Sequence, residues 1–269
     1  VQATGYVRQG TGAAAPLRLS SGWTHPVEQA RESVRAAIHA RVPDARMAGV
    51  ISALVVGDQS AIERADWDVF RTTGVAHLMS ISGLHVTLFA WLAAAGVAAL
   101  WRRSARLVLL WPAQHAGLAG GVLLAWAYAL FSGWGVPSQR TVCMLGVVAL
   151  LRIVGLGWPW PMVWLCACAA VVLLDPWALT QAGFWLSFVA VGVLFAADAG
   201  GGTAERAQGP VAAAVRMLRE QMVLTLALAP LTLLLFQQVS LVGLAANLLA
   251  IPWVTLLLMP LSLLGIVLA

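Results

Sequence analysis

Histidine and serine side chains gather in one short stretch of an otherwise apolar part of the sequence. His77, Ser80, Ser82 and His85 fall within nine residues. Each His/Ser pair is spaced three residues apart and so shares one helix face, and Gly83 between them would let a second helix approach closely. Polar groups are costly to bury in lipid, so they must face a wet cavity or another helix. Three interpretations stay open: helix packing at a polar helix end, a polar translocation path, and Ser/His catalysis, for which no third orienting group is evident.

A second cluster, residues 133–140, reads GWGVPSQR and combines a chain break with an arginine. The glycines interrupt one helix, and Pro137 suits the first turn of the next. The positive end of that helix and Arg140, about one turn inside, together form a plausible phosphate site. The alternative is an arginine that snorkels to the interface or pairs with a backbone carbonyl. The candidate polar side chains of this cluster are Ser138, Gln139 and Arg140.

Two further polar positions interrupt later apolar runs. Ser187 follows Gly183 at the start of a short apolar segment, and Asn247 precedes Pro252 in another. A buried asparagine there forms a helix–helix hydrogen bond or lines a pore. We expect Gly83, Pro137, Gly183 and Pro252 to serve as helix-packing or hinge positions.

The composition indicates a membrane protein. Of 269 residues, 61% are hydrophobic and 10% are charged, against about 45–50% and about 25% in soluble domains. This excludes a typical soluble enzyme and a nucleic-acid-binding arm. The three cysteines lie in apolar runs without zinc-ligand spacing, so we expect neither a metal site nor a cofactor. All 16 basic residues are arginines, which mark cytoplasmic loops in membrane proteins.

The apolar runs predict an all-α polytopic membrane bundle with short amphipathic helices before it. A span needs about 20 apolar residues, and seven candidates follow residue 75, the fifth of them short and the last, with Pro252 and Pro260, broken or double. They are 76–100, 107–131, 136–155, 158–174, 183–197, 215–237 and 241–269.

Three regions are expected along the chain. Residues 1–26 suggest the tail of an external domain, residues 27–74 interfacial amphipathic helices, and residues 75–269 a transmembrane domain. Because the chain opens on Val1 and ends within an apolar run, we expect an internal piece of a longer protein, truncated at its C-terminus.

The arginines also predict an orientation. After position 100, the arginines of the short loops all lie in every second loop, beginning with the loop that holds Arg102, Arg103 and Arg106. If those loops are cytoplasmic, the N-terminal part is external, which is periplasmic in a two-membrane bacterium.

The ordered motifs resemble the ComEC competence proteins, inner-membrane DNA-uptake channels of natural transformation. The resemblance covers roughly residues 30–269 and rests on five motifs in order: residues 77–86 (HLMSISGLHV), 136–140 (VPSQR), 175–176 (DP), 183–188 (GFWLSF) and 247–252 (NLLAIP). It implies an external OB-like domain, whose last strand Gly5-Tyr6-Val7-Arg8 resembles, and often a nuclease domain after this region. No metal-binding HxHxDH motif occurs here, so we expect no enzyme activity from this part.

What the resemblance implies is passage of single-stranded DNA across the cytoplasmic membrane, in contact with the lipid bilayer. Its implied partners are a periplasmic DNA receptor and a cytoplasmic DNA translocase. Two alternatives stay open. A small-molecule or ion transporter would fit the broken helices at Pro137 and Pro252, although no internal repeat is visible. A rhomboid-like serine protease would need a histidine facing Ser82, and the only candidate, His115, is expected at the opposite end of its span.

Overall fold

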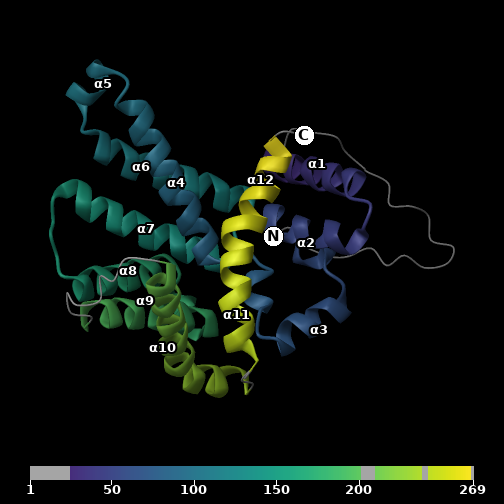
Figure 1. The fold of residues 1–269 in the computed structure, drawn as a ribbon. Helices are drawn as coiled ribbons and strands as arrows, with labels where there is room; N and C mark the ends of the chain where they lie inside the picture. Colours follow the sequence, from purple (N-terminus) through teal and green to yellow (C-terminus); the bar gives the residue numbers. More distant parts are fainter. Residues whose placement is uncertain (1–24, 201–209, 238–241, 268–269) are drawn as a thin grey trace.

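The computed structural model describes residues 25–200, 210–237 and 242–267, and within these ranges every regular element is helical (Figure 1). The expected all-α class is therefore confirmed for the described part. The expected strand at residues 5–8 lies outside the described residues.

The N-terminal unit consists of α1 (Pro26–Arg41), α2 (Ala45–Val56) and α3 (Arg64–Thr72), with a short 3-10 turn at Gln59–Ala61. The Asp44 side chain caps α2 by accepting from two backbone N–H groups of its first turn. Gly57 ends α2 in a left-handed conformation, with a φ of 73°. In this region, where interfacial helices are expected, α2 is exposed over its first three residues and mostly buried from Ala48 onward, with Ala53 and Leu54 completely inaccessible. It therefore belongs to the packed bundle.

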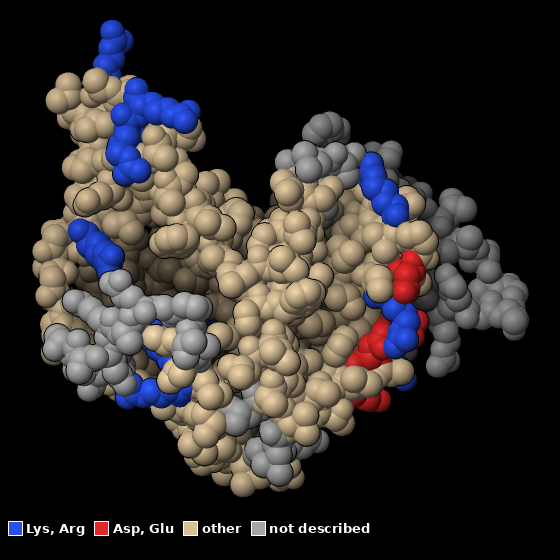
Figure 2. Space-filling model, viewed as in Figure 1, with Lys and Arg blue, Asp and Glu red and all other residues tan. Residues whose placement is uncertain are grey.

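Charged side chains lie on the outer face of this unit (Figure 2), and several of them form ion pairs. Arg35 pairs with Asp58 at 3.1 Å, and Arg46 pairs with Asp66. The hydrogen bond from Arg46 holds the pKa of Asp66 below its ordinary value. Figure 2 shows basic and acidic side chains interleaved here, whereas the basic side chains on the opposite side of the molecule lack acidic neighbours in this view.

The apolar part continues through nine helices, some joined by short 3-10 turns at Ala76–Leu78 (η2) and Pro176–Thr180 (η3). The helices within the described ranges are α4 (Gly83–Trp101), α5 (Ala105–Leu110), α6 (Ala113–Phe131), α7 (Val136–Val154), α8 (Trp160–Leu174), α9 (Ala182–Gly200), α10 (Pro210–Phe236), α11 (Gly243–Pro252) and α12 (Met259–Val267).

Seven spans are not confirmed. Among the described residues, four helical segments are long and apolar enough to cross a membrane: Ala76–Trp101, Val136–Val154, Val215–Phe236 and Ala245–Gly265. The expected span at 107–131 is divided at Pro112 into α5 and α6, and the first turn of α6 carries polar Gln114 and His115. α8, at 15 residues, is about 22 Å long, shorter than the hydrocarbon core of about 30 Å.

The last expected span is a continuous helical rod rather than two segments. α11 and α12 are joined by a π-helical segment, Trp253–Leu258. Pro252 lacks a backbone N–H, and a local π-turn lets the helix continue past the proline with a changed hydrogen-bond register. In Figure 1 this rod lies between the N-terminal helices and α7–α10. Its α12 packs against α2 and its α11 against α10.

The helices α4, α6 and α7 alternate in direction, so this part of the bundle has two distinct ends. At one end, Ala98 of α4, Gln114 of α6 and Arg152 of α7 line a common hollow. At the other, the first residue of α4, Gly83, lies against Thr141 of α7. The arginines that follow α4 and Arg152 therefore share one end, and both predicted polar clusters lie at the opposite end.

Candidate functional site

Ser82 and His85 form a cap on the N-terminus of α4. The Ser82 hydroxyl accepts from the His85 backbone N–H at 3.4 Å, and the His85 Nδ1 accepts from the Ser82 backbone N–H at 3.3 Å. This is the reciprocal capping box in which a Glu or Gln more often occupies the third position. Because Nδ1 accepts, the ring proton lies on Nε2, which is buried without a hydrogen-bond partner among the described residues.

His77 and Asn247 meet at one backbone carbonyl, although they lie far apart in the sequence. The Gly74 carbonyl oxygen is 3.1 Å from His77 Nδ1 and accepts from Asn247 Nδ2 at 3.4 Å. A carbonyl only accepts, so in this contact His77 Nδ1 is the donor. The Asn247 Oδ1 atom is buried and has no partner among the described residues. This contact ties α11 to the segment that precedes α4.

Gly83 brings the first cluster against the second. A Cβ at position 83 would lie 2.6 Å from the Thr141 hydroxyl oxygen, closer than real Cβ contacts. The Thr141 hydroxyl is itself engaged, since it donates to the Pro137 carbonyl at 2.9 Å. The start of α4 and the first turns of α7 are therefore in direct backbone-to-side-chain contact.

Arg140 points the other way, toward the start of α9. It is 6% exposed, and its Nη2 would be 2.8 Å from a Cβ at position 183, so Gly183 makes room for the guanidinium. Its Nε and Nη1 are buried with no hydrogen-bond partner among the described residues. The acidic group that acts on it electrostatically is Asp175. The Asp175 carboxylate already accepts from the Trp177 backbone N–H and from Gln181.

The remaining predicted residues make local contacts or are buried within their own helices. The Ser80 hydroxyl donates to the His77 carbonyl, Gln139 donates to the Trp134 carbonyl at 2.7 Å, and Ser138 is buried. Pro137 stands in the first turn of α7, as its missing N–H favours. Ser187 is half-buried on α9, and Pro252 ends α11.

Three further hydroxyl groups are buried that the sequence pattern does not single out. Ser52 of α2, Tyr128 of α6 and Thr255 of the π-helical segment each bury an oxygen without a partner among the described residues. Unpaired buried polar atoms are rare in folded proteins and call for an explanation. Their signal in the sequence is weak, because single hydroxyls are common in apolar helices.

The geometry of Ser82 does not suit nucleophilic attack. The Ser82 hydroxyl contacts the His85 backbone and not its ring, and His115 lines the hollow at the opposite end of the bundle. Among the described residues, no group of three or more His, Cys, Asp or Glu could hold a metal ion. The arrangement offers hydroxyls, an amide and one buried cation at one end of an apolar bundle.

Replacing Gly83 with valine should disrupt this site, because the added side chain would meet the Thr141 hydroxyl. A Gly96→Val variant is the matched control, since a Cβ at position 96 of the same helix meets nothing within 4 Å. We expect a lower unfolding temperature for Gly83→Val than for Gly96→Val in detergent. Thr141→Ala should restore part of the loss in a Gly83→Ala background, and purely additive effects would contradict the contact.

Comparison with known proteins places this geometry in context. The family model described as "Competence protein" matches residues 54–269. Competence protein ComA of Neisseria gonorrhoeae is 42% identical over 221 residues, which cover 81% of this chain and 30% of that protein. The uncharacterized protein YcaI of Escherichia coli is 37% identical over 81% of this chain and 29% of its own length. Recombination protein 2 of Haemophilus influenzae is 29% identical over 81% of this chain and 28% of its own. The chain thus spans less than a third of these relatives, and no solved structure matches it.

Proposed function

The chain belongs to the competence protein family, and from that premise we propose that it forms the membrane passage for single-stranded DNA during natural transformation. The observation that carries the proposal is the contact of Gly83 in the first polar cluster with Thr141, next to the second, which brings the two clusters to one end of an apolar bundle. Asn247, from a third and distant segment, meets His77 of the first cluster at the Gly74 carbonyl.

The sparse charge of this end suits a moving strand. Single-stranded nucleic acid carries one negative charge per nucleotide and is bound without sequence preference by cationic and stacking surfaces. A conduction path must also release what it binds. One buried arginine with several hydroxyl and amide groups provides attraction without a dense basic groove. We propose His77, Ser80, Ser82, His85, Ser138, Gln139, Arg140, Ser187 and Asn247 as the path residues.

Crosslinking tests the passage directly. A photoreactive amino acid at position 139, at the start of α7, should capture labelled DNA in transforming cells. The matched control is position 123 of α6, where Leu123 is exposed on the apolar surface. Capture at 139 and not at 123 is expected. Normal DNA uptake without capture at 139 would contradict the proposed path.

The proposed orientation places this polar end outside and the end that carries Arg102 and Arg152 in the cytoplasm. The proposed location is the bacterial cytoplasmic membrane, between a periplasmic DNA receptor and a cytoplasmic DNA translocase. The orientation is tested with single cysteines at positions 103 and 135, after replacement of Cys143, Cys166 and Cys168 by alanine. An impermeant thiol reagent added to cells with a permeable outer membrane should label position 135 only. Labelling of position 103 instead would reverse the orientation.

A further inference from the structure

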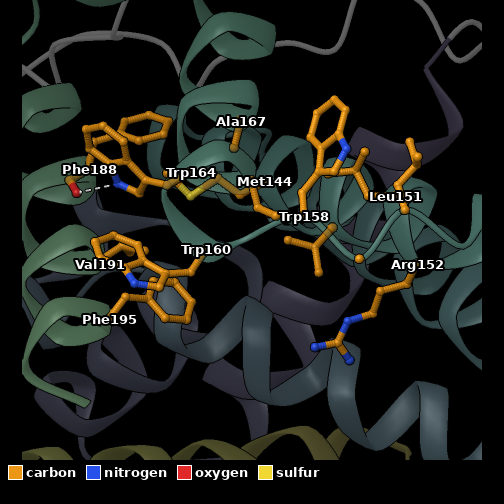
Figure 3. A pocket seen from close by; sticks show the side chains of 14 residues that line it. Met144, Leu151, Arg152, Trp158, Trp160, Trp164, Ala167, Phe188, Val191 and Phe195 are labelled. Atoms are coloured by element: carbon orange, nitrogen blue, oxygen red, sulfur yellow. Dashed lines mark hydrogen bonds between the residues drawn. The ribbon is translucent and has the colours of Figure 1, made fainter. Parts of the chain in front are cut away.

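An apolar pocket of about 300 Å³ opens between α7, α8 and α9, at the end of the bundle away from the polar clusters (Figure 3). Five of the fourteen residues that line it are aromatic. Trp160 stacks on Phe195 with ring centroids 5.9 Å apart, and Trp164 donates to the Phe188 carbonyl at 2.9 Å. These contacts tie α8 to α9 on two successive turns, so the wall is preformed. Its volume lies at the lower limit for small-molecule sites.

Arg152 stands at the edge of this pocket and also borders a second, more polar hollow. Figure 3 shows its guanidinium apart from the aromatic rings. The second hollow, of about 580 Å³, lies between α4, α6 and α7 and is lined by Gln114 and His115 as well. Arg152 is exposed, near the C-terminal end of α7. One cation thus borders two cavities, of which the second is the more polar.

We propose that this pair of cavities binds one anionic phospholipid. The phosphate lies at Arg152, with Gln114 and His115 as further polar contacts, and one acyl chain enters the aromatic pocket. An apolar pocket alone would accept any acyl chain, but the arginine at its edge favours a negatively charged headgroup. Tryptophans such as Trp158 and Trp160 suit the level of the headgroups. The bound lipid would bridge α7 to α8 and α9 on the arginine-rich side of the membrane.

The phosphate contact is tested by native mass spectrometry of the purified chain released from nanodiscs. The nanodiscs contain equal amounts of phosphatidylglycerol and phosphatidylcholine. We expect the chain to retain phosphatidylglycerol preferentially and Arg152→Gln to lower that preference about fivefold, the factor for one arginine near an anionic surface. Arg103→Gln is the matched control, because Arg103 is exposed after α4 and lines neither cavity. An unchanged preference in Arg152→Gln overturns the proposal.

The acyl-chain contact needs a second pair of variants. Val191→Trp should fill the pocket and reduce retention of both lipids, whereas Leu165→Trp, exposed on α8 outside the pocket, should not. If Val191→Trp unfolds the chain, Val191→Phe is used instead, because its smaller side chain fills less of the pocket. Equal retention in the folded pocket-filling variant and in Leu165→Trp overturns the pocket assignment. If Arg152→Gln weakens binding of a 20-nucleotide DNA strand but leaves lipid retention intact, the cation serves DNA and the lipid proposal is wrong.

Discussion

Replacing Gly121 with leucine is expected to prevent formation of a stable bundle. Gly121 lies where α6 crosses α4, and a Cβ there would be 2.7 Å from the Ala90 carbonyl oxygen and 2.8 Å from the Ala94 Cβ. Gly117, one turn earlier, lies equally close to α4. Small residues spaced four apart let two membrane helices bring their backbones together. The carbonyl oxygen belongs to the α4 backbone and cannot rotate away, so the two helices must separate.

The expected loss exceeds the roughly 1–3 kcal/mol that overpacking usually costs, because a whole side chain is added against backbone. Gly121→Ala should show a smaller decrease in the same direction. Gly146→Leu is the control, since a Cβ at position 146 of α7 meets only Val122, at 4.0 Å. Size-exclusion profiles and thermal unfolding in detergent provide the measurement. Equal unfolding temperatures for Gly121→Leu and Gly146→Leu would show that α4 and α6 do not pack as described.

Sequence periodicity and motifs predicted the helical class and located both polar clusters, since polar residues in apolar runs are conspicuous. The contacts that these polar residues make with distant segments could not be predicted. Nothing near Asn247 indicates that its amide reaches Gly74, 173 positions away. Likewise, the fit of Arg140 beside Gly183 depends on how α7 and α9 cross. Such contacts arise from tertiary packing, which the pattern of a single sequence does not reveal.

Local interpretation also missed how helices begin and break. The first span was expected from residue 76, and the candidate span does run over Ala76–Trp101, but the α-helix within it begins only at Gly83, because Ser82 and His85 together cap it there. The usual capping box has a glutamate or glutamine at the third helical position, so a histidine there is not recognised as a cap from the sequence. The expected count of seven spans is not confirmed, for a related reason. Apolar composition alone does not show that Pro112 divides one run or that α8 is too short to cross.

Replacing Arg140 with glutamine is expected to lower DNA uptake strongly while the chain still folds. A charge facing lipid at that depth would cost roughly 2.5–3.5 kcal/mol on insertion scales, and the observed burial against α9 avoids lipid. Its Nε and Nη1 remain without partners among the described residues, and its guanidinium is well suited to phosphate. Loss of one hydrogen bond to a charged group, about 1.5–3 kcal/mol, corresponds to roughly a ten- to hundredfold decrease in rate.

The decisive quantity is uptake per folded molecule in a transformable host that depends on this protein. Arg140→Lys should be intermediate, because lysine keeps the charge and loses the planar fork. Arg103→Gln controls for loss of a positive charge at the other end of the bundle. If Arg140 instead stabilises the fold through Asp175, then Arg140→Gln and Asp175→Asn should both lower membrane abundance and unfolding temperature. An unchanged rate per folded Arg140→Gln molecule would remove this arginine from the DNA path.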